Sequence, residues 1–129
     1  MFKEVVTPRF SETDALGHIN NTVIPIWFEQ ARRPIFQFFT PDLDPASWSL
    51  IVARIEIDFV GELNYKSDAV IDTSIVKIGN SSFQIQQIIN QGGEIKAKGI
   101  AILVHYSYEK KKSKPIPSEV RVQLEKHLT

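Results

Sequence analysis

The sequence contains no cysteine in its 129 residues. This absence excludes disulfide bonds, thiolate metal sites and a cysteine nucleophile, so any nucleophilic chemistry has to use oxygen or nitrogen. The chain also lacks an excess of charge, since 15 Lys and Arg residues balance 15 Asp and Glu residues. No overall field therefore attracts nucleic acid or an acidic membrane surface. No apolar run approaches the length that spans a bilayer.

The length and the composition indicate a single domain over residues 1–129. Hydrophobic residues make up 43% of the chain and charged residues 23%, which is typical of a globular domain with its own core. The first residues, Met1–Val6, include the acid Glu4 and lack the pattern of a secretory signal. We therefore expect a cytoplasmic protein.

One long segment carries an apolar stripe with helical spacing. Apolar side chains recur every three or four residues between Thr22 and Phe39, and this period predicts the principal helix over that segment. Pro25 is compatible with the first turn, where N–H groups have no partner inside the helix. Pro34 is expected to kink or end the helix.

Strand-like sequence surrounds the helical segment. Glu4–Phe10 predicts a first strand, and the period-two alternation of residues 54–59 predicts a strand with one buried face, formed by Ile55, Ile57 and Phe59. Further strands are predicted over residues 69–78, 83–89 and 95–106, with short turns suited to antiparallel hairpins. A terminal helix is predicted from Pro117, with Ser118 as its N-cap. The pattern indicates an α+β domain in which one curved antiparallel sheet covers the principal helix.

The polar segment directly before the principal helix is the candidate site. It places Asp14, His18 and the two amides Asn20 and Asn21 within a few residues of the helix start. A helix N-terminus offers unpaired N–H groups that can hold a developing oxyanion in acyl transfer, and a carboxylate can attack or activate water. The alternative is structural: Asp and Asn are common turn and cap residues, and Gly17 can simply supply a positive φ.

The motif resembles a known family. The segment Arg9–Asn21, followed by Trp27–Arg32 on the helix, is similar to the hotdog-fold thioesterases of the 4-hydroxybenzoyl-CoA thioesterase type and their acyl-CoA and acyl carrier protein relatives. A second, weaker match is Val76–Phe83. The resemblance implies an α+β hotdog fold, a curved antiparallel sheet wrapped around one principal helix, and covers nearly the whole chain.

The resemblance also implies residue roles. The catalytic carboxylate of the family falls on Asp14, as nucleophile or as general base for water. The backbone N–H that polarises the thioester carbonyl falls on Asn21. His18 and Asn20 match a segment in which such groups position water or substrate. We assign His18 to catalysis together with Asp14 and Asn21, and we assign Asn20 and Gly17 to substrate binding.

Other assignments have explicit alternatives. Gly79, Ser81 and Ser82 match a segment that lines the acyl-CoA groove, although an ordinary hairpin turn explains them equally well. Glu29 is a candidate second acid, but capping a polar network or pairing with Arg32 or Arg33 is the simpler expectation.

Two further sequence features bear on the site. His105 sits in an apolar strand, which favours a satisfied core or interface histidine. Many relatives have a tyrosine where Ile24 stands, so the resemblance departs there.

The function implied is hydrolysis of an acyl-CoA thioester to a free acid and coenzyme A. The alternatives are a hotdog dehydratase or hydratase acting on acyl thioesters, and a noncatalytic acyl-CoA binding module. No cofactor is expected, because coenzyme A belongs to the substrate, and no metal, because no cluster has ligand spacing. The family implies a homodimer or a dimer of dimers with a substrate groove between subunits, and an unpaired edge strand favours association in the same way.

Overall fold

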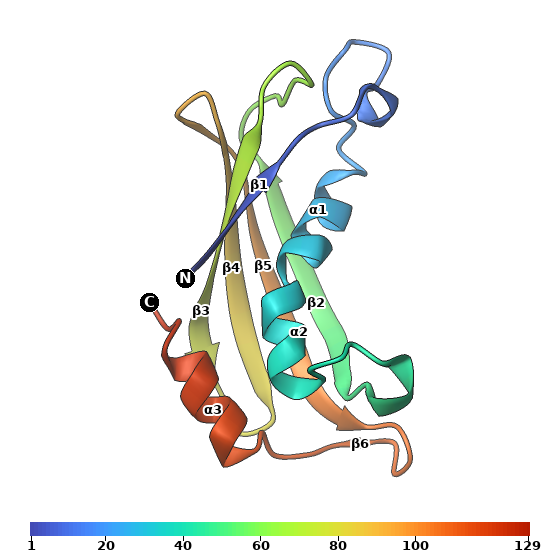
Figure 1. The fold of residues 1–129 in the computed structure, drawn as a ribbon, viewed down its shortest axis with the longest axis vertical. Helices are drawn as coiled ribbons and strands as arrows, with labels where there is room; N and C mark the ends of the chain where they lie inside the picture. The colour runs from blue at the N-terminus through green and yellow to red at the C-terminus, as the bar shows by residue number, and fades with distance from the viewer.

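A strongly curved antiparallel sheet wraps around two short consecutive helices in the computed structural model, which describes residues 1–129 (Figure 1). The strands are β1 (Phe2–Val6), β2 (Leu50–Phe59), β3 (Ala69–Ile78), β4 (Ser82–Gln91), β5 (Glu94–Ser107) and β6 (Lys112–Ser113). The helices are α1 (Ile24–Ala31), α2 (Arg33–Phe39) and α3 (Ser118–Glu125), with 3₁₀ turns at Phe10–Glu12 and Pro45–Ser47. The strand order is β1-β3-β4-β5-β2, and β6 pairs with β5. The predicted α+β architecture is therefore confirmed.

Alternating side chains on the three central strands form the inner surface of the sheet. In β4, every second side chain from Phe83 to Gln91 is buried, and Ile85 pairs with Ile75 of β3 on one side and Ala101 of β5 on the other. These positions face the helices because neighbouring residues in a strand point to opposite faces. The apolar core is therefore the layer between this surface and the helical segment.

The principal helix is interrupted, as the position of Pro34 predicts, and it starts later than expected. α1 begins at Ile24, and Arg32 separates it from α2. Pro34 has no N–H to donate within the helix, and its ring clashes with the carbonyl four residues earlier, so the hydrogen-bond ladder cannot run through. The predicted apolar stripe is confirmed: the buried side chains of the two helices are Ile24, Trp27, Phe28, Ala31 and Ile35.

The expected burial of the face formed by Ile55, Ile57 and Phe59 is wrong for two of these residues, while Ile57 is half-buried against the core. Ile55 is 47% exposed and Phe59 is 53% exposed. Their register opposite Ala101 and Ala97 places them on the inner side of the sheet, but β2 is an edge strand, and neither side chain is covered by the core of this chain. The period-two alternation correctly predicted that these side chains share one face of β2. Whether that face is buried depended on which elements pack against it.

Element ends differ from the prediction at two places. β1 ends at Val6 rather than Phe10, because Pro8 has no N–H to continue the ladder and a 3₁₀ turn follows. Ser118 is the first residue of α3 rather than its N-cap; Pro117 takes the cap position, and no side chain caps the helix.

Candidate active site

The loop between β1 and α1 forms one wall of a cleft of about 440 Å³. The other wall comes from the end of β2, the following residues 61–63 and the start of β5. Its lining includes Asp14, His18, Asn21, Phe59, Glu62 and Lys96. The fold therefore brings the three predicted catalytic residues into one cleft.

Asp14 is held by the backbone of its own loop. Its Oδ1 accepts hydrogen bonds from the N–H groups of Leu16 at 2.8 Å and His18 at 3.2 Å. Gly17 completes the turn with a φ of +80°, a conformation that glycine adopts without a steric penalty. The other carboxylate oxygen makes no hydrogen bond within the protein. One oxygen thus fixes the orientation of the group and leaves the second for chemistry in the cleft.

His18 faces a carboxylate that sequence reasoning missed. Its Nε2 lies 3.1 Å from Oε2 of Glu62. Next to this pair, the N–H of Ile19 donates a hydrogen bond to the carbonyl of Leu63 at 2.7 Å, which joins the backbones of the two loops. Nothing in the sequence marks Glu62, because it lies more than forty residues from His18 in a loop without a motif. The imidazole is therefore positioned by Glu62 rather than by Asp14.

The two asparagines differ in their surroundings. Oδ1 of Asn20 accepts hydrogen bonds from the N–H of Thr22 at 3.0 Å and from its hydroxyl at 2.9 Å, so this side chain shapes the turn that leads into α1. The N–H of Asn21 makes no hydrogen bond within the protein. A free donor is therefore available three residues before the helix, although α1 starts at Ile24 and not at Thr22 as predicted.

Gly79, Ser81 and Ser82 lie at the opposite end of the sheet from Asp14 within one chain. The loop after β1 lies at the top of Figure 1 and the β3–β4 turn lies at the bottom, separated by the ten residues of β3, or roughly 30 Å. Arg121 of α3 donates to the carbonyl of Gly79 at 2.7 Å. The structure thus gives this turn structural contacts and does not bring it to Asp14 in the same chain.

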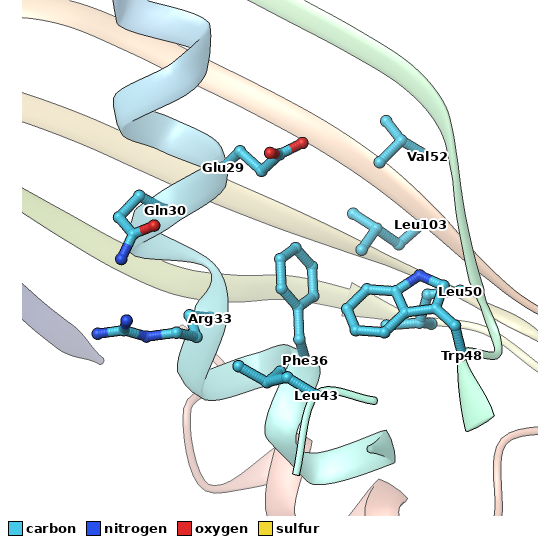
Figure 2. Close-up of a pocket in the computed structure, with 9 residues that line it drawn as sticks. All are labelled: Glu29, Gln30, Arg33, Phe36, Leu43, Trp48, Leu50, Val52 and Leu103. Carbon is cyan, nitrogen blue, oxygen red and sulfur yellow. The ribbon is translucent and has the colours of Figure 1, made fainter. Parts of the chain in front are cut away.

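Glu29 borders a second cavity of about 380 Å³ between the helices, residues 43–48 and β2 (Figure 2). Its side chain extends toward Val52, while the guanidinium of Arg33, which also lines the cavity, extends in the opposite direction. The expected pairing with Arg32 or Arg33 is wrong, since Glu29 forms no ion pair with either residue. Glu29 is therefore an exposed, unpaired acid on the β2 side of α1.

Arg32 is instead buried at the break between α1 and α2. It donates through Nη1 to Oε1 of Gln87 at 3.2 Å, and Gln87 donates to the carbonyl of Phe28 at 2.9 Å. Burial lowers the pKa of the Arg32 guanidinium, and the charge of Glu29 acts in the opposite direction. This network anchors the helix break to the sheet.

His105 is a buried histidine with a satisfied hydrogen bond, as predicted. Its Nδ1 lies 2.9 Å from the carbonyl oxygen of Pro115, and its ring centroid is 5.3 Å from that of Phe39. Burial is the main cause that lowers its pKa; the charge of Lys114 adds to this effect, and the backbone hydrogen bonds oppose it. His105 therefore belongs to the core and not to the cleft.

Two further findings concern metal binding and membrane insertion. No three His, Asp or Glu side chains gather closely enough to hold a metal ion. No helix has both the length and the apolar character needed to cross a membrane. The expectation that the protein uses no metal stays a prediction.

A curved antiparallel sheet around a central helical segment, with a polar loop before the helix, defines the hotdog class of fold. Solved structures share it closely. A predicted thioesterase from Bacillus stearothermophilus is 43% identical, with a TM-score of 0.97 over 99% of this chain and 96% of that one. A thioesterase from Thermus thermophilus, in a crystal structure with coenzyme A and Zn, is 30% identical, with a TM-score of 0.85 over 96% and 91%.

The chain belongs to the thioesterase-like superfamily, whose family model matches residues 8–124. Among curated proteins, the uncharacterized protein YsmA of Bacillus subtilis strain 168 is 28% identical over 113 residues, which are 87% of this chain and 77% of YsmA. The resemblance seen in the sequence motif is thereby confirmed at the level of the family and the fold.

Proposed function

We propose that this protein is an acyl-CoA thioesterase, and that Asp14 is its catalytic carboxylate. The observation that carries the proposal is the state of Asp14: one oxygen is fixed by two backbone N–H groups, and the other makes no hydrogen bond. The thioesterase from Thermus thermophilus with coenzyme A bound supports the choice of a coenzyme A thioester as substrate. Coenzyme A is part of that substrate, so the proposal includes no separate cofactor and no metal.

The chemistry follows from the groups in the cleft. Asp14 either attacks the thioester carbonyl carbon and forms a mixed anhydride that water then hydrolyses, or it takes a proton from the water that attacks. In both routes the carbon–sulfur bond breaks, and coenzyme A leaves as a thiolate that gains a proton. The free N–H of Asn21 is the proposed donor to the oxyanion. His18, held by Glu62 at 3.1 Å, is proposed to position water, with Asn20 and Gly17 shaping the substrate side of the loop.

The proposal includes a homodimer formed through β2. One edge of this ten-residue strand has no partner in the sheet, and Ile55 and Phe59 on its inner side are largely exposed. An unpaired edge of this length with apolar side chains is a surface that natural proteins cover. In such a dimer the β3–β4 turn with Gly79, Ser81 and Ser82 is proposed to contact the coenzyme A arm of the neighbouring subunit's substrate.

The proposed reaction is tested with a panel of aliphatic, hydroxylated and aromatic acyl-CoAs, assayed by release of the coenzyme A thiol. We expect hydrolysis of at least one class. Hydration or dehydration of an enoyl-CoA or 3-hydroxyacyl-CoA, without thiol release, would favour the hotdog hydratase. Tight binding without any turnover would favour a noncatalytic binding module. A dimer of dimers is distinguished from a dimer by sedimentation.

A further inference from the structure

The segment 62–67, which carries Glu62, is held by one buried glutamine. Gln91, the last residue of β4, is 4% exposed and lies outside the lining of the cleft. Its Oε1 accepts from the N–H of Asn64 at 3.0 Å, and its Nε2 donates to the carbonyls of Asn64 at 2.8 Å and Ser67 at 2.9 Å. An amide offers two N–H donors and one carbonyl oxygen, so the whole group is used on the backbone of this segment.

The same segment is joined to the loop of Asp14 through the backbone. His18 and Asn64 form an antiparallel bridge, and the N–H of Ile19 donates to the carbonyl of Leu63 at 2.7 Å. His18 in turn donates its N–H to Oδ1 of Asp14 at 3.2 Å, and its carbonyl accepts from the N–H of Asp14 at 2.7 Å. A displacement of the segment would therefore be passed to His18 and to the carboxylate of Asp14.

Glu62 determines which nitrogen of His18 carries the proton. Oε2 of Glu62 lies 3.1 Å from Nε2 of His18, and an ionised carboxylate can only accept a hydrogen bond, so Nε2 is assigned as the N–H of the ring. Nδ1 makes no hydrogen bond within the protein, and in a neutral imidazole it is then the acceptor. The Glu62 side chain is 72% exposed, and an exposed pair holds itself together only weakly. The hydrogen bonds of Gln91 therefore keep the backbone of Glu62 beside the imidazole.

We infer that Gln91 and Glu62 are positioning residues of the cleft. Gln91 fixes the segment that carries Glu62, and Glu62 holds the imidazole of His18 with Nδ1 as the free acceptor for the attacking water. The inference rests on the proposed function, in which His18 positions that water. Loss of either residue should lower kcat and leave KM nearly unchanged, because the substrate keeps its contacts while the water loses its orientation.

The kinetic test replaces each residue alone and both together. Gln91→Met keeps the length of the side chain and removes its hydrogen bonds, and Glu62→Ala removes the acceptor. Each should lower kcat for thiol release by about tenfold to a hundredfold, with KM within about twofold of the wild-type value, on the scale that misplacement of a reacting group costs. In the double variant the second substitution should cost less than about threefold, because both act through His18. Two losses that multiply in full would overturn the inference.

Two variants separate positioning from loss of stability. Glu62→Gln retains an oxygen that accepts from Nε2–H, so its kcat should lie within about threefold of wild type; a rate as low as that of Glu62→Ala would overturn the acceptor role. Gln87 is the matched control for Gln91, because it lies on the same face of β4, is 2% exposed, and donates to α1 and β3 instead. Gln87→Met removes buried hydrogen bonds in the same strand and should leave the state of His18 unchanged. An equal effect of Gln87→Met and Gln91→Met on His18 would overturn the assignment.

Nitrogen NMR of His18 reads out this state without turnover. The chain has three histidines, so the spectrum of a His18→Gln protein assigns the signal. At about pH 9, where imidazoles are neutral, the wild-type ring should be protonated at Nε2 alone, whereas Gln91→Met and Glu62→Ala should show exchange between both tautomers. This difference in a protein that releases no thiol from any acyl-CoA would overturn the thioesterase and support the positioning role. Identical His18 spectra in wild type and both variants would overturn the inference, whatever the activity.

Discussion

The ring of Phe28 lies against the backbone of Gly99 so closely that a Cβ atom added there would be 2.7 Å from Cε2 of the ring. Phe28 is buried on α1, and Gly99 belongs to β5. The absence of a side chain at this position lets the helix approach the sheet. Because the same helix follows the Asp14 loop, this contact also sets the position of the cleft wall.

Gly99→Ala is expected to lower the free energy of unfolding by about 1–3 kcal/mol, the usual cost of inserting a methyl group into a filled core. Urea denaturation measures the change. Gly61→Ala is the matched control, because the nearest atom to its added Cβ is in the flexible Lys96 side chain at 3.1 Å. Equal stability of the Gly99→Ala and wild-type proteins would show that α1 shifts freely on the sheet.

Asp14→Asn is expected to lower kcat by a factor of about 10² to 10⁴, the range typical of a lost general base, or further if Asp14 is the nucleophile. Asparagine retains an oxygen that can accept the N–H groups of Leu16 and His18, so the fold should persist. Thiol release measures kcat, and calorimetry measures retained acyl-CoA binding. Asp68→Asn, at an exposed carboxylate without hydrogen bonds, is the control. Near wild-type turnover by Asp14→Asn would remove Asp14 from the mechanism.

Activity is expected to depend on the dimer. Ile55→Lys places a charge on the exposed inner side of β2 and should weaken association, because a buried unpaired charge is strongly unfavourable. Sedimentation and thiol release are measured together over a dilution series. Val5→Lys, at an exposed position on the other edge strand β1, should leave both unchanged. A fully active monomer at nanomolar concentration would contradict the shared site.

The stability of the protein is expected to fall as the pH decreases through the titration range of His105. The pKa of His105 in the folded state is lowered by burial, so the unfolded chain binds the proton more readily. The stabilisation that His105 contributes to the folded state is fully present above its pKa in the unfolded chain, near 6.5. It is lost toward lower pH, and the free energy of unfolding falls by at most about 1.4 kcal/mol per pH unit for one proton.

Urea denaturation at several pH values between about 8 and about 5 measures this loss. His105→Asn retains an amide donor for the carbonyl of Pro115 and removes the titration, so its pH slope should be smaller. The pKa of His127 is lowered by burial, by the N-terminal charge and by Lys126, so this residue changes the stability with pH in the same direction. A His127→Asn variant separates the effects of the two histidines. Equal slopes for the wild-type and His105→Asn proteins would contradict the role of His105.

Local sequence determined most of the elements and the composition of the site loop. The period-two pattern places every second side chain of β4 on one face, and the helical period places Trp27 and Phe28 against it. The turn that contains Asp14 and Gly17 is held by hydrogen bonds within residues 14–18. Such features follow from backbone geometry and short-range hydrogen bonds, which the order of residue types specifies directly.

The tertiary structure alone decided which distant residues meet. Glu62 reaches His18 only because the segment after β2 folds back beside the Asp14 loop. Ile55 and Phe59 on the inner face of β2 stay exposed because the core of this chain does not cover them. The turn at Gly79 lies far from Asp14 because β3 runs the length of the sheet. These outcomes depend on the packing of whole elements, and the residue pattern within any one segment carries no information about what covers it.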